Sequence, residues 1–442
     1  MIRSRAVPQS DPRSAAAALL SFLFPGVGQA YNGQWALASL LAVPVMLIVV
    51  LGVLVLALGG SGALSRLFDS RVLIALIVLD VALLGWRLVA ILQAHGERSR
   101  LTFRAWPTWV TGLLVIATLA MHAFPAYYAA KAIDTLGSVS LEGGGALFDE
   151  REGRDVEIVE PSLQPEVGER VTVLLVGVDY AAGRDHHLTD TMLVTTFDSE
   201  TNRAAMISVP RDLYGVPLGD GRTYNAKLNS LMSRASADPA EYPMGGPASL
   251  KAAIGELLGT RIHYFAAIDI DGMRQVIDNI GGVDVVVDRA INDPRYRDTF
   301  TGQQGFVLEA GPQHLDGPRA MGFIRSRMGA GDSDFTRAER QQIVLTAIAE
   351  KLTAGNLMLT LPGLLDAVRD NVATDIPSRR LSELATTGQD ANLNRIERVV
   401  LAPPEFVTPE PNSAAGYILH PNFEAIRELA ERIFGSQTAE VP

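Results

Sequence analysis

The chain has 442 residues, which is enough for two or three units that each bury a core. Its formal net charge of −11 argues against a protein that coats nucleic acid, but not against a site for a small anion. The absence of cysteine from the sequence excludes disulfides and thiolate metal sites. Residues 14–65 carry no charged side chain, whereas later residues have the composition of a water-soluble domain. The sequence therefore predicts a membrane region followed by a soluble domain.

Three apolar segments in residues 1–130, the predicted membrane region, are long enough to cross a bilayer, which needs about 20 apolar residues. They cover residues 35–58, 72–94 and 107–130. A fourth apolar segment, 14–24, is too short to cross and ends at a Pro-Gly pair, so we interpret it as a re-entrant or interfacial half-helix. A cleavable signal peptide is the alternative, but no convincing small-x-small cleavage site follows.

Arginines set the predicted orientation of these spans. They precede the first span or lie between the second and third: Arg3, Arg5, Arg13, Arg98, Arg100 and Arg104. Because positive loops stay in the cytoplasm, the N-terminus is expected inside and everything after residue 130 outside. Asp80 and Arg87 share one helix face within the second span. They are either a functional pair or a snorkelling arginine and a carboxylate that pairs with a neighbouring helix.

Residues 131–170 are predicted to be a linker, because they contain glycines, prolines and acidic residues with little apolar periodicity. Residues 171–442 alternate between strand and helix patterns. The predicted strands are 171–178, 191–197, 204–209, 263–270, 283–287 and 398–401. The predicted helices are 248–258, 272–280, 337–352, 361–370, 380–386 and 422–434. This alternation predicts one α/β domain with helices on both faces of a sheet.

Two carboxylates stand at strand ends. Asp179 ends the first predicted strand and Asp190 opens the second, so the loop between them can return both side chains to one edge of the sheet. Two hard oxygen ligands with open positions suit Mg²⁺. The alternative is that each aspartate caps a turn.

Arginines follow in three later clusters. Arg211 comes directly after a strand, and Asp212 can hold its guanidinium. Arg325 and Arg327 alternate with a serine, so in an extended segment both would point the same way and grip adjacent phosphate oxygens. The alternative for this pair is a solvated edge.

The third cluster opens a helix with Arg337, Arg340 and Gln341, where a helix N-terminus favours an anion. Asp334 either caps that helix or orients an arginine. Lys227 and Asn229 can also reach the site, although Lys227 could equally be a surface charge.

The clusters, in this order, resemble the LytR-CpsA-Psr family of membrane-anchored phosphotransferases, from about residue 171 to the C-terminus. That family attaches lipid-linked polymers to the bacterial cell wall. The resemblance implies an extracytoplasmic domain with a central mixed sheet flanked by helices. It implies Mg²⁺ on Asp179 and Asp190, and pyrophosphate held by Arg211, Arg325, Arg327, Arg337 and Gln341. In the family an arginine usually stands two residues before the second metal-binding aspartate, and here that position is Leu188.

Nearby residues could replace that arginine: Arg184, His186 and His187. The family fold also implies a tunnel for a polyprenyl chain. Apolar helix faces that could line it, or form ordinary core, contain Ile254, Leu257, Leu258, Met273, Val276, Ile277, Ile343, Val344 and Ile348.

The expected function is transfer of a polyprenyl-pyrophosphate-linked glycopolymer, such as teichoic acid, onto peptidoglycan with release of polyprenyl phosphate. No side-chain nucleophile stands out, so direct transfer is expected; Asp212 and Asp334 are candidate general bases. The alternatives are a pyrophosphatase and a non-catalytic polyprenyl-phosphate-binding or regulatory membrane protein.

Overall fold

The computed structural model describes residues 11–65, 69–99, 101, 105–139, 170–179, 188–198, 203–353, 357–377, 380 and 396–435. The predictions on Arg184, His186 and His187 lie outside these residues, as do most of the linker and of the helix at 380–386. The side chain of Asp179 also lies outside the described part, although its backbone is included. The chain divides into two compact units between Asp134 and Thr135.

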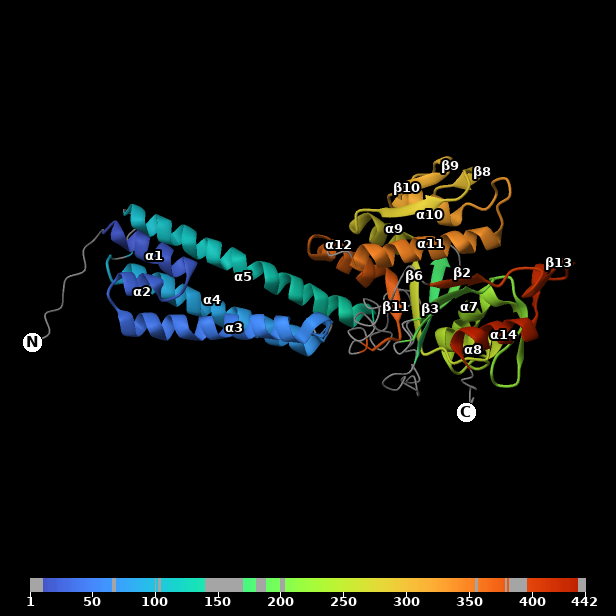
Figure 1. The fold of residues 1–442 in the computed structure, drawn as a ribbon, viewed down its shortest axis with the longest axis horizontal. Helices are drawn as coiled ribbons and strands as arrows, with labels where there is room; N and C mark the ends of the chain where they lie inside the picture. Colours follow the sequence, from blue (N-terminus) through green and yellow to red (C-terminus); the bar gives the residue numbers. More distant parts are fainter. Residues whose placement is uncertain are drawn as a thin grey trace, which may run out of the picture. The chain divides into compact units, whose positions relative to one another are not determined.

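The first unit is helical (Figure 1). Its helices are α1 Arg13–Leu23, α2 Val27–Tyr31, α3 Trp35–Ser65, α4 Ser70–Gly96 and α5 Trp106–Val139, the last of which continues into the second unit. The long helices α3, α4 and α5 are long and apolar enough to cross a membrane. They confirm three apolar helices at the positions that the sequence predicts.

The predicted half-helix is α1, and it packs against the other helices of its unit. Gly26 follows it with φ +99°, and a Cβ there would lie only 2.4 Å from the carbonyl oxygen of Ala38. The buried amide of Gln29 in α2 donates to the carbonyl of Ala90 in α4 at 2.7 Å. The break after α1 therefore turns the chain back into its own helical bundle.

Both charged residues of the second span have partners within the first unit. Asp80 lies 2.7 Å from Nδ1 of His122 in α5, which confirms the interpretation that it pairs with a neighbouring helix. Arg87 donates to the carbonyl of Phe22 at the end of α1, at 2.6 Å. Snorkelling of Arg87 to the inner membrane surface stays a prediction.

The second unit is built on a six-stranded sheet in the order β11-β6-β1-β2-β3-β12. The strands are β1 Val171–Asp179, β2 Leu188–Asp198, β3 Arg203–Ser208, β6 Tyr264–Asp269, β11 Val372–Thr374 and β12 Glu397–Val400. The pairs β1–β6 and β3–β12 are parallel and the other pairs are antiparallel. The sheet is therefore mixed, as the resemblance implies.

Helices cover both faces of this sheet (Figure 1). One core contains side chains of β1, β2 and β3 together with the helices α7 Leu231–Ala237, α8 Gly245–Leu258 and α14 Phe423–Phe434. The other contains side chains of α9 Ile270–Asn279, α10 Gly317–Arg325, α11 Asp334–Thr353 and α12 Leu357–Asn371. The nine apolar residues suggested for a lipid tunnel belong to these two cores or pack against them. This agrees with the alternative of ordinary core.

Several short elements have no counterpart among the predicted ones. They include α7, α10, the 3₁₀ turn Leu228–Ser230 and the strand pairs β4 Tyr214–Pro217 with β5 Thr223–Lys227, β8 Ile291–Arg297 with β9 Gln304–Leu308, and β13 Val407–Ser413 with β14 Gly416–Pro421. The predicted strand β7 Val283–Val287 pairs with β10 Gly311–Leu315 outside the main sheet. The condition that Arg325 and Arg327 share an extended segment is not met, because Arg325 is the last residue of α10.

Candidate functional site

A β-bulge displays Asp190 at the end of the central strands. Gly177 pairs with Thr191 and Val178 pairs with Thr189, so Asp190 is the extra residue on β2. A bulge lets consecutive side chains turn to the same side of a strand. Asp190 and Thr191 accordingly both line one cavity. The backbone of Asp179 ends β1 beside this bulge, where it pairs with Leu188.

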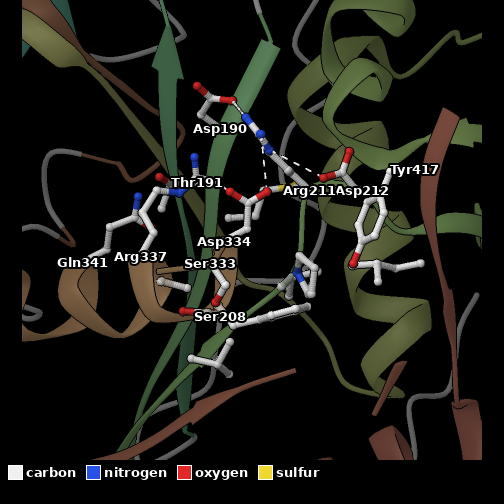
Figure 2. A pocket seen from close by; sticks show the side chains of 17 residues that line it. Asp190, Thr191, Ser208, Arg211, Asp212, Ser333, Asp334, Arg337, Gln341 and Tyr417 are labelled. Atoms are coloured by element: carbon white, nitrogen blue, oxygen red, sulfur yellow. Dashed lines mark hydrogen bonds and ion pairs between the residues drawn. The ribbon is translucent and has the colours of Figure 1, made fainter. Parts of the chain in front are cut away.

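Arg211 and Asp212 reach the same place from the turn after β3. Their carbonyl groups accept hydrogen bonds from the amides of Asn229 and Leu419, at 3.0 Å in each case. These two bonds join the turn to the 3₁₀ turn after β5 and to β14. The arginine side chain is thereby directed at Asp190, with Nη1 to Oδ1 at 2.5 Å (Figure 2).

The cavity between these elements has a volume of about 180 Å³. Charged and polar side chains from β2, from the end of β3 and the turn after it, from Ser333 and the first part of α11, and from β14 line it. They are Asp190, Thr191, Ser208, Arg211, Asp212, Ser333, Asp334, Arg337, Gln341 and Tyr417 (Figure 2). Apolar side chains, including Met192, Val209, Phe335 and Leu419, complete the wall.

Asp334 connects the positive charges around the cavity. Its carboxylate lies 3.4 Å from Arg211, 3.5 Å from Arg337 and 3.9 Å from Arg327. It does not cap α11, because Ser333 does so by exchanging hydrogen bonds with Thr336 at 3.2 and 2.9 Å. Of the two roles predicted for Asp334, the structure shows the one that orients arginines.

Electrostatics keep Arg211 charged inside the cavity wall. Burial disfavours its charge, but Asp190, Asp334 and Asp212 together outweigh burial and raise its pKa above the ordinary value. Burial lowers the pKa of Arg337, although Asp334 opposes this effect. Both guanidiniums stay charged at neutral pH, because arginine is not deprotonated in proteins. The Nε–H groups of Arg211 and Arg337 are buried and donate no hydrogen bond within the described residues.

Other predicted site residues lie around this centre. Lys227 binds Asp212 at 2.9 Å, and Arg327 reaches Asp334 with its side chain 46% exposed. Asn229 is buried, and its carbonyl accepts a hydrogen bond from the hydroxyl of Thr189 at 3.1 Å. These residues are near the cavity without being among its described lining.

Two predicted arginines are directed elsewhere. Arg325 hydrogen-bonds to the hydroxyl of Thr299 at 3.1 Å, because the end of α10 places it toward the β8–β9 connection. Arg340 is buried, donates to the carbonyl of Ser326 at 2.6 Å and pairs with Asp332 at 3.4 Å. Arg340 is thus held in the interior, whereas Gln341 lines the cavity.

Tyr417 is a cavity residue that sequence reasoning missed. It belongs to β14, which the amide of Leu419 ties to the carbonyl of Asp212. Burial, followed by the nearby carboxylates of Asp212 and Asp334, raises the pKa of the Tyr417 hydroxyl. No local motif marks Tyr417, since only the long-range pairing of β14 brings it to the site.

The side chains in the described part of the cavity that could hold a metal cation are carboxylates. Asp190, Asp212 and Asp334 all line the cavity, and Arg211 contacts all three. Hard oxygens of this kind suit Mg²⁺. No group of three or more acidic or histidine side chains with metal-site geometry occurs within the described residues.

Comparisons with known proteins show to which family the chain belongs. The LytR_cpsA_psr family matches residues 145–417, more than half of the chain. The polyisoprenyl-teichoic acid–peptidoglycan teichoic acid transferase TagU of Oceanobacillus iheyensis is 29% identical over 299 residues, covering 66% of this chain and 83% of the relative. TagV of Bacillus subtilis, which carries the same transferase description, is 24% identical over 253 residues, covering 54% of this chain and 60% of the relative. The crystal structure of B. subtilis TagV has a TM-score of 0.47 at 22% identity, covering 60% of this chain and 98% of that chain. The match to residues 145–417 shows that the chain belongs to the LytR_cpsA_psr family.

Proposed function

We propose that this protein transfers a teichoic-acid-type glycopolymer from a polyprenyl-pyrophosphate carrier onto peptidoglycan. Membership of the family and the transferase names of TagU and TagV support the reaction type. The observation that carries the proposal is the cavity in which Arg211 and Arg337 meet Asp190 and Asp334. Neighbouring guanidiniums suit a pyrophosphate, because each planar fork can bind two oxygens.

The reaction is a direct phosphoryl transfer. A hydroxyl oxygen of peptidoglycan attacks the phosphorus that carries the sugar, and the bond from this phosphorus to the bridging oxygen breaks. Polyprenyl phosphate leaves with that electron pair, while the hydroxyl proton passes to a base. Asp212 and Asp334 line the cavity and are the candidates for the base. Arg211 and Arg337 stabilise the charge that develops on the phosphate oxygens, which is usually the largest catalytic contribution.

Magnesium binding belongs to the same proposal. Asp190, together with Asp179 at the neighbouring strand end, would hold the ion. The carboxylate of Asp190 is 36% exposed and opens to the cavity, which suits an exchangeable hard cation. The ion would supply Lewis-acid neutralisation of the pyrophosphate.

Orientation in the membrane is the third part of the proposal. The three apolar helices α3, α4 and α5 support anchoring in a membrane. With the arginines of the N-terminus and of the α4–α5 connection in the cytoplasm, three crossings place the cavity outside, where peptidoglycan lies.

A product assay tests the transferase proposal. The full-length protein in lipid nanodiscs is incubated with a short polyprenyl-pyrophosphate oligosaccharide, a peptidoglycan fragment and Mg²⁺, and products are identified by mass spectrometry. A phosphodiester-linked glycan on the fragment is the expected product. Free sugar phosphate alone would replace the proposal with a pyrophosphatase, and bound but unchanged donor would replace it with a binding role.

A further inference from the structure

The carboxylate of Asp293 is buried, and both of its oxygens accept hydrogen bonds. Asp293 lies in β8 with 1% of its surface exposed. Its Oδ1 accepts hydrogen bonds from the amides of Arg295 and Tyr296, both at 3.0 Å. The ladder between β8 and β9 is interrupted between Asp293 and Arg297, so these amides depend on the side chain for a partner.

The second oxygen of this carboxylate holds another segment. Oδ2 accepts from the hydroxyl of Ser326 at 2.9 Å and from the amides of Arg327 and Met328, both at 3.1 Å. Burial opposes ionisation of Asp293, but these donors outweigh it and lower the pKa of the carboxyl. Five donors therefore converge on one ionised group.

Arg340 fixes the same segment from the opposite side. Its Nη2 donates to the carbonyl of Ser326 at 2.6 Å, and Asp332 pairs with it at 3.4 Å. Ser326 is completely buried. Its hydroxyl and its carbonyl are thus both bound to charged, buried side chains, and the backbone directly after α10 is fixed.

The residue presented by this fixed backbone is Arg327. Its guanidinium lies 3.9 Å from Asp334, and its side chain is 46% exposed at the edge of the cavity. We propose that Asp293 is a positioning residue, whose carboxylate sets the backbone of residues 326–328 so that Arg327 reaches a pyrophosphate in the cavity. This inference rests on the proposed function, because it requires that Arg327 contact the donor.

Asp293→Asn separates this role from simple stabilisation. The substitution keeps the shape of the side chain, but its amide group turns a donor toward amides that need an acceptor. If Asp293 acts through Arg327, the two substitutions must be non-additive. The dissociation constant of geranyl pyrophosphate is therefore measured on the full-length protein in nanodiscs with wild type, Asp293→Asn, Arg327→Ala and the double variant.

We expect Asp293→Asn alone to weaken binding about tenfold, the size of one lost charge-assisted interaction. In the Arg327→Ala background the same change should have little further effect. Asp375→Asn is the matched control, because that half-buried carboxylate accepts from the amide of Phe265 and pairs with Lys251, without a hydrogen bond to the 326–328 segment. Its effect on binding should be small and additive with Arg327→Ala.

Equal effects of Asp293→Asn in both backgrounds would overturn the positioning role, as would unchanged binding in that variant. If Asp293→Asn does not fold, Ser326→Ala removes one of the five donors and enters the same cycle. Failure of Arg327→Ala to weaken binding has a different meaning. It would overturn the placement of Arg327 in the donor site, whereas the transferase proposal itself rests on Arg211 and Arg337 and is decided by its product assay.

Discussion

Asp334 is the carboxylate that the arginines around the cavity share as a partner. It lies within 3.9 Å of three arginines, and the most buried of these, Arg337, has only 9% of its side chain exposed. A buried guanidinium is costly without a partner, so each arginine here needs a carboxylate or a bound anion. A donor pyrophosphate would supply such an anion to the arginines.

The hydroxyl of Tyr417 is expected to act as a hydrogen-bond donor in the cavity. Because burial and then the carboxylates of Asp212 and Asp334 raise its pKa, Tyr417 stays protonated to a higher pH than an ordinary tyrosine and remains a hydrogen-bond donor. Tyr417→Phe should lower kcat/KM about tenfold, as expected for one lost hydrogen bond. The loss should be constant between pH 6 and 9, a range chosen well below the ordinary tyrosine pKa of about 10.

The measurement is the pH profile of kcat/KM for both proteins. Tyr214→Phe, on β4 and outside the described lining, is the control and should leave kcat/KM unchanged. A loss in Tyr417→Phe that disappears as pH rises toward 9 would show that Tyr417 ionises in this range, against the account.

Magnesium dependence is tested at Asp190. Asp190→Asn removes one of the three negative charges that line the cavity, the one proposed to bind Mg²⁺, so the rate of transfer at saturating Mg²⁺ should fall by about 100-fold or more. Asp198→Asn changes the same residue type at the other end of β2 and should leave the Mg²⁺ dependence unaltered. Titrating Mg²⁺ against the initial rate provides the comparison. Identical Mg²⁺ curves for wild type and Asp190→Asn would remove this residue from the metal site.

Among the elements, α11 matters most for the site because its first turn supplies three cavity residues. Ser333 begins that turn by exchanging hydrogen bonds with Thr336. Ser333→Ala should reduce the free energy of unfolding by about 1 kcal/mol, the usual value for a lost N-cap. Ser333→Asn, which keeps a capping side chain, should recover most of it.

The free energy of unfolding of the second unit is measured for both variants by chemical denaturation, with circular dichroism as the signal. If Ser333→Asn lowers the free energy of unfolding as much as Ser333→Ala does, the loss comes from the cavity wall and not from the cap.

Local sequence patterns predict the site residues whose position follows from the strand or helix that contains them. Asp190 at a strand start and Arg337 with Gln341 at four-residue spacing are examples, because strand ends and helix faces follow from the sequence itself. The extended segment predicted for Arg325 is wrong, since Arg325 ends α10, a helix of only nine residues whose glycines and proline weaken the helical pattern. Tyr417 and Asp293 were missed because distant pairings, β14 with the turn after β3 and β8 with the end of α10, create their contacts.

At the scale of the whole molecule, the proposed orientation can be read directly because the chain has no cysteine. Single substitutions Ser70→Cys, Glu97→Cys and Asp220→Cys place one thiol at the first residue of α4, directly after α4 and in the second unit. Three crossings with the N-terminus inside predict that a membrane-impermeant maleimide labels positions 70 and 220 in intact cells. Position 97 should react only after lysis. Labelling of position 97 in intact cells would show that the α4–α5 connection lies outside, and would contradict the proposed orientation.

The most direct test of the central claim compares two arginines of the second unit. Arg211 forms the centre of the cavity, whereas Arg203 is a solvent-exposed arginine at the start of β3 with 65% of its side chain exposed. The measurement is the rate at which full-length wild type, Arg211→Ala and Arg203→Ala transfer labelled glycan from a polyprenyl-pyrophosphate donor to a peptidoglycan fragment. The account predicts a loss of about 100-fold or more in Arg211→Ala and a wild-type rate in Arg203→Ala. A folded Arg211→Ala protein that transfers glycan at the wild-type rate would contradict it.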